Sequence, residues 1–230
     1  MVPVIRIRRQ VVARTLWIST AVVLGLGIFQ IVFVAVFGAE TFFGRLQRIA
    51  LDSELCLPAW YSSMLMMVAA ILSGLCGLDA RQRDPRNARA WIALSFIFVY
   101  LSLDEMTGLH ELLVPIMHNA LRPTGFFLFA WVIVAIPLVI FVGAMFLPFL
   151  FRLPGPIGRR IAVAGFVFVA GALGMEMVGG KLFSVYGRTP IYYAGAFVEE
   201  ALEMIGIVLL ILAVLDHLGR SGRVALDLDR

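Results

Sequence analysis

The chain has 230 residues, of which 61% are hydrophobic and only 15% are charged. A soluble domain carries about 25% charged residues, so this composition and a mean hydropathy of +0.96 exclude an ordinary water-soluble fold. The formal net charge of +4 does not indicate nucleic-acid binding, because no basic patch is interleaved with aromatic residues as that function requires.

Six segments are apolar enough, and close enough to the required length of about 20 residues, to cross a bilayer as helices. Turn- and charge-rich sequences separate them, such as the stretch from Asp79 to Arg86. We therefore predict an all-α, polytopic membrane helical bundle that forms a single transmembrane domain over residues 1–230. The predicted spans are 12–37, 60–78, 90–117, 126–151, 161–180 and 193–216, and residues 38–59 are predicted to form an outer loop with a short interfacial helix.

The basic residues predict the orientation of this bundle, because Arg and Lys are enriched in the cytoplasmic segments of membrane proteins. With the N-terminus inside, every inner segment contains more basic residues than any outer one. We therefore expect both termini to be cytoplasmic, in a bacterial inner membrane. The inner residues are Arg6, Arg8, Arg9, Arg14, Arg81, Arg83, Arg86, Arg89, Arg152, Arg159, Arg160, Arg220, Arg223 and Arg230, and the outer ones are Arg45, Arg48, Arg122, Lys181 and Arg188.

Small residues recur four positions apart and predict where the helices pack. Ala170 and Gly174 form one such pair, with Gly171 beside them, and Ala70 and Gly74 form another. Such pairs let the backbones of neighbouring membrane helices approach closely.

The spans 90–117, 161–180 and 193–216 contain seven acidic residues in their interiors but no Arg or Lys. One charge near the centre of a bilayer costs about 2.5–3.5 kcal/mol, so protons or cations must offset these acids. The acids are Asp104, Glu105, Glu111, Glu176, Glu199, Glu200 and Glu203; His110 lies among them and His118 just beyond the third span.

The predicted depths and faces of these residues agree. With a rise of about 1.5 Å per residue, all of the acids lie in the outer half of the membrane. On one continuous helix, Asp104, Glu111 and His118 form a single stripe, because positions seven apart are nearly in line. Glu199 and Glu203 stand one above the other, where like charges repel. We therefore expect one shared site.

An acidic cluster with imidazole groups predicts a cation-binding site, for which a metal ion is the first candidate. Carboxylate and imidazole ligands suit Fe, Mn or Zn, although the Glu-x-x-His motif of helical-bundle dimetal proteins is absent here. The corresponding function is a membrane metalloenzyme that acts on a lipid-soluble substrate. The expected metal ligands are Asp104, His110, Glu111, His118, Glu176, Glu199 and Glu203, with Glu105 and Glu200 as further candidates.

Two alternatives stand beside the metal site. The same acids suit a proton or cation relay in a transporter or channel, although the inner halves of the spans lack the polar groups of a complete pathway. The other alternative is a structural or redox-complex subunit. The expected partners are the lipid bilayer and a lipid-soluble substrate or cation, with no nucleic acid, and an oligomer is compatible with the pattern.

Overall fold

The structure is a computed structural model, which describes residues 7–38, 47–51, 53, 55–220 and 226–227. The two-residue strands β1 (Ile7–Arg8) and β2 (Leu226–Asp227) pair in parallel, so the two ends of the chain lie together. The α-helices are α1 (Arg9–Phe37), α2 (Leu57–Ala80), α3 (Pro85–Thr107), α4 (Leu113–Leu121), α5 (Val132–Arg152), α6 (Pro156–Val169), α7 (Glu176–Tyr186) and α8 (Pro190–Arg220). The shorter segments are the 3-10 helices η1 (Gln47–Ile49), η2 (Leu109–Leu112) and η3 (Gly125–Phe127) and the π-helix η4 (Ala170–Met175).

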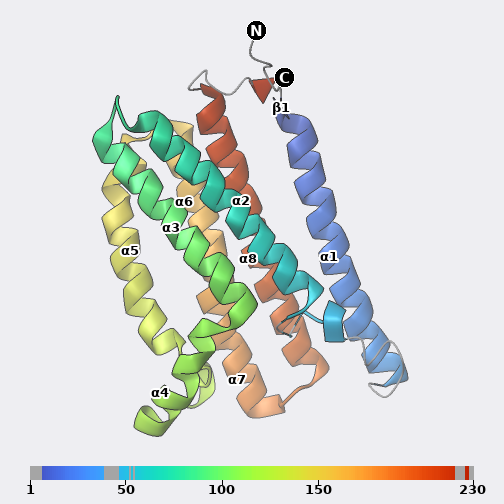
Figure 1. Ribbon diagram of the computed structural model, residues 1–230. Coiled ribbons are helices and arrows are strands. Elements are labelled where there is room, and N and C mark those ends of the chain that lie inside the picture. The colour runs from blue at the N-terminus through green and yellow to red at the C-terminus, as the bar shows by residue number, and fades with distance from the viewer. Residues whose placement is uncertain (1–6, 39–46, 52, 54, 221–225, 228–230) are drawn as a thin grey trace.

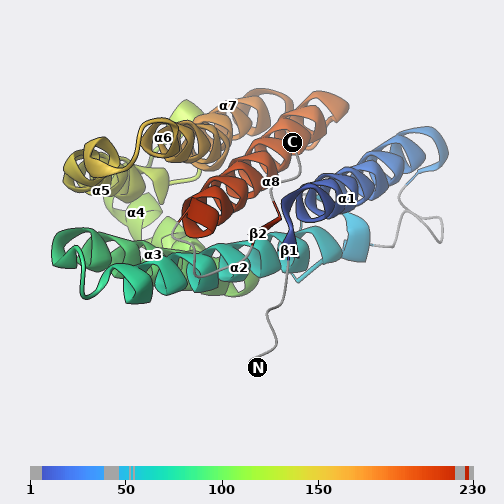
Figure 2. The same ribbon diagram turned by 90° about the horizontal axis from the view of Figure 1, so that it is seen from above.

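Helix α8 runs through the middle of the bundle (Figures 1 and 2). Seen from above, α2 and α3 lie on one side of α8 and α6 and α7 on the other, whereas α1 lies beside α8 at the edge of the molecule. The side chains of Met204, Val208 and Val214 on α8 are completely buried. Helix α8 therefore supplies the centre of the apolar core.

Five helical stretches among the described residues are long and apolar enough to cross a membrane. They are α1, α2, α3, α5 and the continuous stretch Pro156–Tyr186, which comprises α6, η4 and α7. Each corresponds to one of the predicted spans. Helix α8 corresponds to the predicted span 193–216 but is not one of these five, so its crossing of the membrane stays a prediction.

The structure does not have one continuous helix over 90–117, because α3 ends at Thr107. Gly108 follows with φ 58°, a left-handed conformation that glycine adopts without strain. Its N–H donates to the Asp104 carbonyl at 2.7 Å and closes the helix. The chain then continues as η2 and α4, and Figure 1 shows α4 at the lower end of the bundle. The expected stripe of Asp104, Glu111 and His118 on one helix is therefore not formed.

The other predicted boundaries differ less from the structure. The span predicted over 126–151 begins at Val132, because η3 and a turn precede α5. The span predicted over 161–180 is the middle of the longer stretch Pro156–Tyr186. Most of the predicted interfacial helix in the loop 38–59 lies outside the described residues, and Gln47–Ile49 forms a single 3-10 turn.

Two glycines allow the backbone of α8 to contact the backbone of the α6–η4 segment directly. A Cβ atom on Gly206 would lie 2.6 Å from the backbone nitrogen of Phe168, and one on Gly171 would lie 2.9 Å from the carbonyl oxygen of Glu199. Nothing lies within 4 Å of the corresponding position on Gly174. Of the small residues expected to pack on this segment, Gly171 rather than Gly174 therefore makes the close contact with α8.

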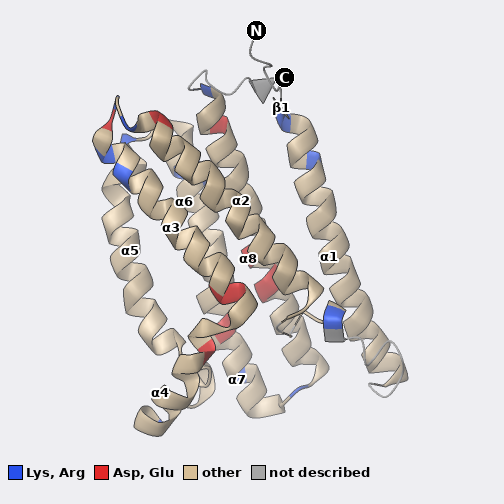
Figure 3. Ribbon diagram, viewed as in Figure 1, with Lys and Arg blue, Asp and Glu red and all other residues tan. Residues whose placement is uncertain are grey.

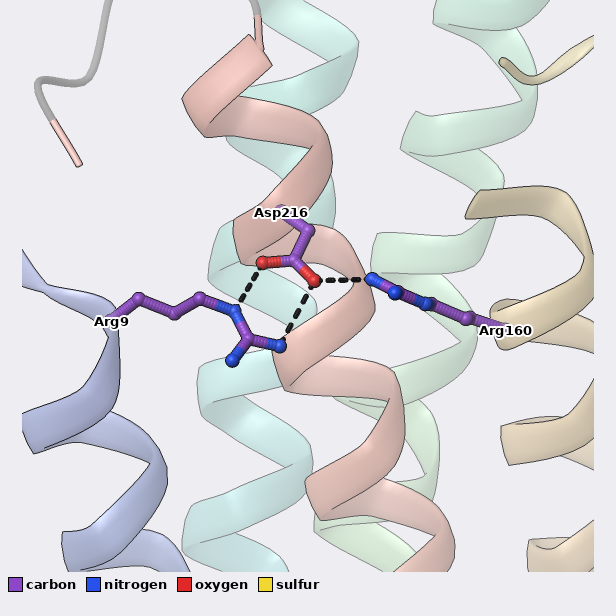
Figure 4. Close-up of polar contacts among 3 residues, drawn as sticks. All are labelled: Arg9, Arg160 and Asp216. Atoms are coloured by element: carbon purple, nitrogen blue, oxygen red, sulfur yellow. Dashed lines mark hydrogen bonds and ion pairs between the residues drawn. The ribbon is translucent and has the colours of Figure 1, made fainter. Parts of the chain in front are cut away.

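At the end of the bundle that carries the chain termini, Asp216 joins three helices (Figure 4). Its carboxylate is buried and accepts hydrogen bonds from the Nε and Nη2 atoms of Arg9 on α1. Nη1 of Arg160 on α6 donates to the same carboxylate at 2.7 Å. Charge-assisted hydrogen bonds are stronger than neutral ones, so this triad fixes both α1 and α6 to α8.

Replacing Gly206 with alanine should separate α8 from α6. The new methyl group meets backbone atoms that cannot rotate away, so we expect the free energy of unfolding to fall by about 1–3 kcal/mol. Gly165→Ala is the matched control. Gly165 lies on α6, a helix of the same pair, and nothing lies within 4 Å of the position that its Cβ would take. Thermal unfolding in detergent measures both variants. Equal stability of the two would contradict the close contact.

Replacing Asp216 with asparagine should loosen the attachment of α1 and α6. Two guanidinium groups would then face each other without their carboxylate, so we expect a loss of about 2 kcal/mol in the free energy of unfolding. Arg160→Ala should destabilise less than Asp216→Asn, since Arg9 stays paired. Arg159→Ala, which removes a neighbouring exposed charge outside the triad, should leave the melting temperature unchanged.

Candidate functional site

A cavity of about 770 Å³ lies between α3, α5, α8 and the η4–α7 segment. Figure 3 shows acidic residues on α3 and α8 at a similar level in the bundle, whereas most Lys and Arg residues lie at the end that carries the termini. The structure brings almost all of the expected site residues to this one cavity. Those that line it are Asp104, Glu105, His110, Glu111, Glu176, Glu199, Glu200 and Glu203.

His118 is not among the residues that line this cavity. It lies on α4, and its Nε2 atom is 2.7 Å from the carbonyl oxygen of Leu128. The end of α3 at Thr107 is the physical reason, because the chain turns there and α4 no longer continues the direction of α3. The structure therefore gives His118 a contact with the backbone instead of a place in the cavity lining.

The same turn brings Asp104 and His110 into direct contact. One carboxylate oxygen of Asp104 accepts the backbone N–H of His110 at 2.8 Å, and the other lies 2.9 Å from its Nδ1 atom. Burial lowers the pKa of His110, but the hydrogen bond and charge of Asp104, with the charges of Glu176 and Glu111, outweigh burial and raise the pKa above its ordinary value of 6.5. The imidazole is therefore held in its protonated form over a wider pH range.

Trp131 connects this pair to the acids on the other side of the cavity. Its indole Nε1–H donates to a carboxylate oxygen of Glu176 at 2.8 Å, and its ring centroid lies 4.7 Å from that of His110. Trp131 is not among the site residues expected from the sequence. The sequence does contain one indication of its role, a tryptophan within a predicted apolar span. A buried indole N–H needs an acceptor, and the acids of the neighbouring spans are candidates.

Glu176 on α7 and Glu199 on α8 both line the cavity, and a carboxylate oxygen of Glu199 lies 3.9 Å from the position that a Cβ atom on Gly179 of α7 would take. Because like charges repel, neighbouring carboxyl groups of this kind favour a shared proton or a bound cation. Glu203 lies one helical turn from Glu199, opposite the space that Gly171 leaves free. Glu176 itself directly follows the π-helix η4, a type of segment that is frequent at functional sites.

The lining also includes aromatic and apolar groups and one arginine. Arg188, from the turn between α7 and α8, reaches the cavity, as does the buried Tyr192. Val134 and Leu138 on α5 and Phe168 on α6 form part of an apolar wall. The site therefore combines a strongly acidic wall with an apolar one.

Among the residues that the structure describes, no group of three or more His, Cys, Asp or Glu side chains is arranged so that it could hold a metal ion. The contacts of these acids are instead with other groups, since Asp104 is paired with His110 and Glu176 accepts the indole N–H of Trp131. This arrangement attracts positive charge, and its hydrogen-bonded groups can give up or accept protons.

Residues 11–218 match the family described as "Domain of unknown function (DUF8692)", and the chain belongs to this family. No curated protein and no solved structure matches the chain.

Replacing Asp104 with asparagine should lower the pKa of His110. The variant loses the hydrogen-bonded negative charge, whereas burial of the imidazole, which disfavours the protonated form, remains. NMR titration of histidine-labelled protein measures the change, and His118→Gln and His217→Gln variants assign the signals. An unchanged titration of His110 would show that Asp104 does not hold its proton.

The raised pKa of His110 also predicts how the stability of the fold depends on pH. Because the pKa of His110 is higher in the folded state than its ordinary value of 6.5, protonated His110 stabilises the fold. This stabilisation is complete below pH 6.5 and is lost as the pH rises through the folded-state value. The loss should appear in thermal unfolding of the wild-type protein and should be smaller in Asp104→Asn.

Proposed function

We propose that this member of the DUF8692 family is a multi-pass membrane protein whose acidic cavity binds a cation in exchange for protons. One observation carries the proposal. Among the described residues that line the cavity, seven are acidic and only Arg188 is a lysine or arginine. In a low-dielectric surrounding such an excess of carboxyl groups requires positive charge, either as protons or as a bound cation.

The orientation that we propose follows from the basic residues. Lys and Arg gather at the end of the bundle that carries the termini (Figure 3), and the cytoplasmic side of a membrane protein is the side enriched in them. Both termini would then be cytoplasmic, in a bacterial inner membrane that the chain crosses six times. The cavity would lie in the outer half of the bilayer and would receive its cation from that side.

The carboxyl groups of Glu176 and Glu199 support proton exchange, because both line the cavity from adjoining helices. A proton shared by such acids and a bound cation would neutralise the same negative charge. Because net charge inside a membrane is costly, entry of a monovalent cation should release about one proton. Coupling of this kind is what a cation–proton exchanger needs.

A metal centre stays the second candidate, since Asp104, His110, Glu176, Glu199 and Glu203 line one cavity and offer the ligand types that Fe, Mn or Zn accept. It requires the side chains to move closer together than they are among the described residues. For that reason cation exchange fits the geometry better than metal catalysis does.

Calorimetry on detergent-purified protein tests the proposal. We expect wild-type protein to bind at least one of three probes, tetramethylammonium, Mn²⁺ or Zn²⁺, and to release protons as it does so. Titrations in two buffers of different ionisation enthalpy count the protons. The Glu176→Gln/Glu199→Gln variant should bind about tenfold more weakly, which corresponds to ~1.4 kcal/mol.

Asp84→Asn is the matched control, because it also removes a negative charge but lies at the N-terminus of α3, where asparagine caps a helix as well as aspartate does. Folded wild-type protein that binds none of the probes, or equal binding by the control and the double variant, would overturn the proposal. Elemental analysis distinguishes the two candidates. Fe, Mn or Zn near stoichiometry in the wild type and absent from the double variant assigns a metal centre.

A further inference from the structure

The cavity has a wall of exposed side chains between α3 and α5. Tyr100 on α3 and Val134 and Leu138 on α5 line it, yet they expose 51%, 40% and 56% of their surfaces. Tyr100 lies seven residues before the end of α3 and Leu138 six residues after the start of α5, so both lie roughly 10 Å from the adjacent helix ends. Tyr100 and Leu138 therefore lie at similar distances from these helix ends, with Val134 one turn nearer the start of α5, and the gap between the two helices at this level is the candidate entrance of the cavity.

The position of this entrance determines which molecules can reach the cavity. Both α3 and α5 are long and apolar enough to cross a membrane, and a point roughly 10 Å along such a helix lies beside the acyl chains of the lipid. An entrance lined by Tyr100, Val134 and Leu138 is apolar apart from one phenol. It suits a molecule that arrives from the bilayer with its chain still in the lipid.

The residues inside the cavity determine which headgroup that molecule carries. Trp131, Glu176 and Glu199 lie on the cavity wall formed by the start of α5 and by α7 and α8. Carboxyl groups beside an aromatic ring bind organic ammonium groups through charge and cation–π attraction. The cavity of about 770 Å³ is in the size range of pockets for drug-sized organic ligands, and it is far larger than a single ion needs.

We infer that the cavity takes a cationic amphiphile, a single-chain amine or quaternary ammonium, which enters sideways from the bilayer between α3 and α5. Its ammonium group lies near Glu176 and Glu199, and its chain passes Val134 and Leu138 into the lipid. The inference rests on the proposed cation binding and names the class of cation. An anionic amphiphile of the same length is excluded by the acids.

Photocross-linking in lipid nanodiscs tests this. The probe is dodecyltrimethylammonium with a diazirine in the middle of its chain, and peptide mass spectrometry locates the adducts. We expect adducts around Tyr100 and around Val134–Leu138, with competition by unlabelled dodecyltrimethylammonium but not by dodecyl sulfonate. Leu138→Trp, which narrows the opening, should reduce these adducts about tenfold, as for a loss of ~1.4 kcal/mol.

Ile140→Trp is the matched control, since Ile140 lies on the same helix, is 67% exposed and does not line the cavity. It should leave the adducts unchanged. Adducts spread evenly over lipid-facing residues, including Ile18 on α1, would overturn the inference. If the same protein still binds tetramethylammonium or a metal ion, the proposed function stands and only lateral entry fails. If it binds no cation at all, the proposed function fails too.

Discussion

The close approach of α8 to the α6–η4 segment determines where most of the acids stand. Gly171 and Gly206 place two backbones in contact with no side chain between them, so Glu199 and Glu203 are held beside η4 and within reach of Glu176. Helices in lipid gain little from burying apolar surface against each other, and backbone contact through small residues is an effective substitute. The cavity lies between this packed segment, α3 and α5.

The sequence was sufficient to predict the helices and the grouping of the acids. Apolar runs of the required length are a strong signal, and five of them became helices that could span a membrane. Asp104, Glu176, Glu199 and Glu203 were expected to share a site, because acids in apolar runs have few other ways to be stabilised. That reasoning needs only depth along each helix, and the cavity lining agrees with it.

The local details of the site could not be predicted, because they depend on single backbone and side-chain geometries. The hydrophobic periodicity predicted that the third helix continues past Gly108. The helix in fact ends before this glycine, which has φ 58°. The turn then paired His110 with Asp104 and directed His118 to the carbonyl of Leu128. Trp131 has no periodic signal at all, since its role comes from one hydrogen bond to a residue 45 positions away.

The triad of Arg9, Asp216 and Arg160 has a consequence for how the protein is made. Arg9 and Asp216 are 207 positions apart in the chain, so α8 must be synthesised before α1 can form this contact. The contact between α1 and α8 therefore forms late, when α8 has joined the helices made before it.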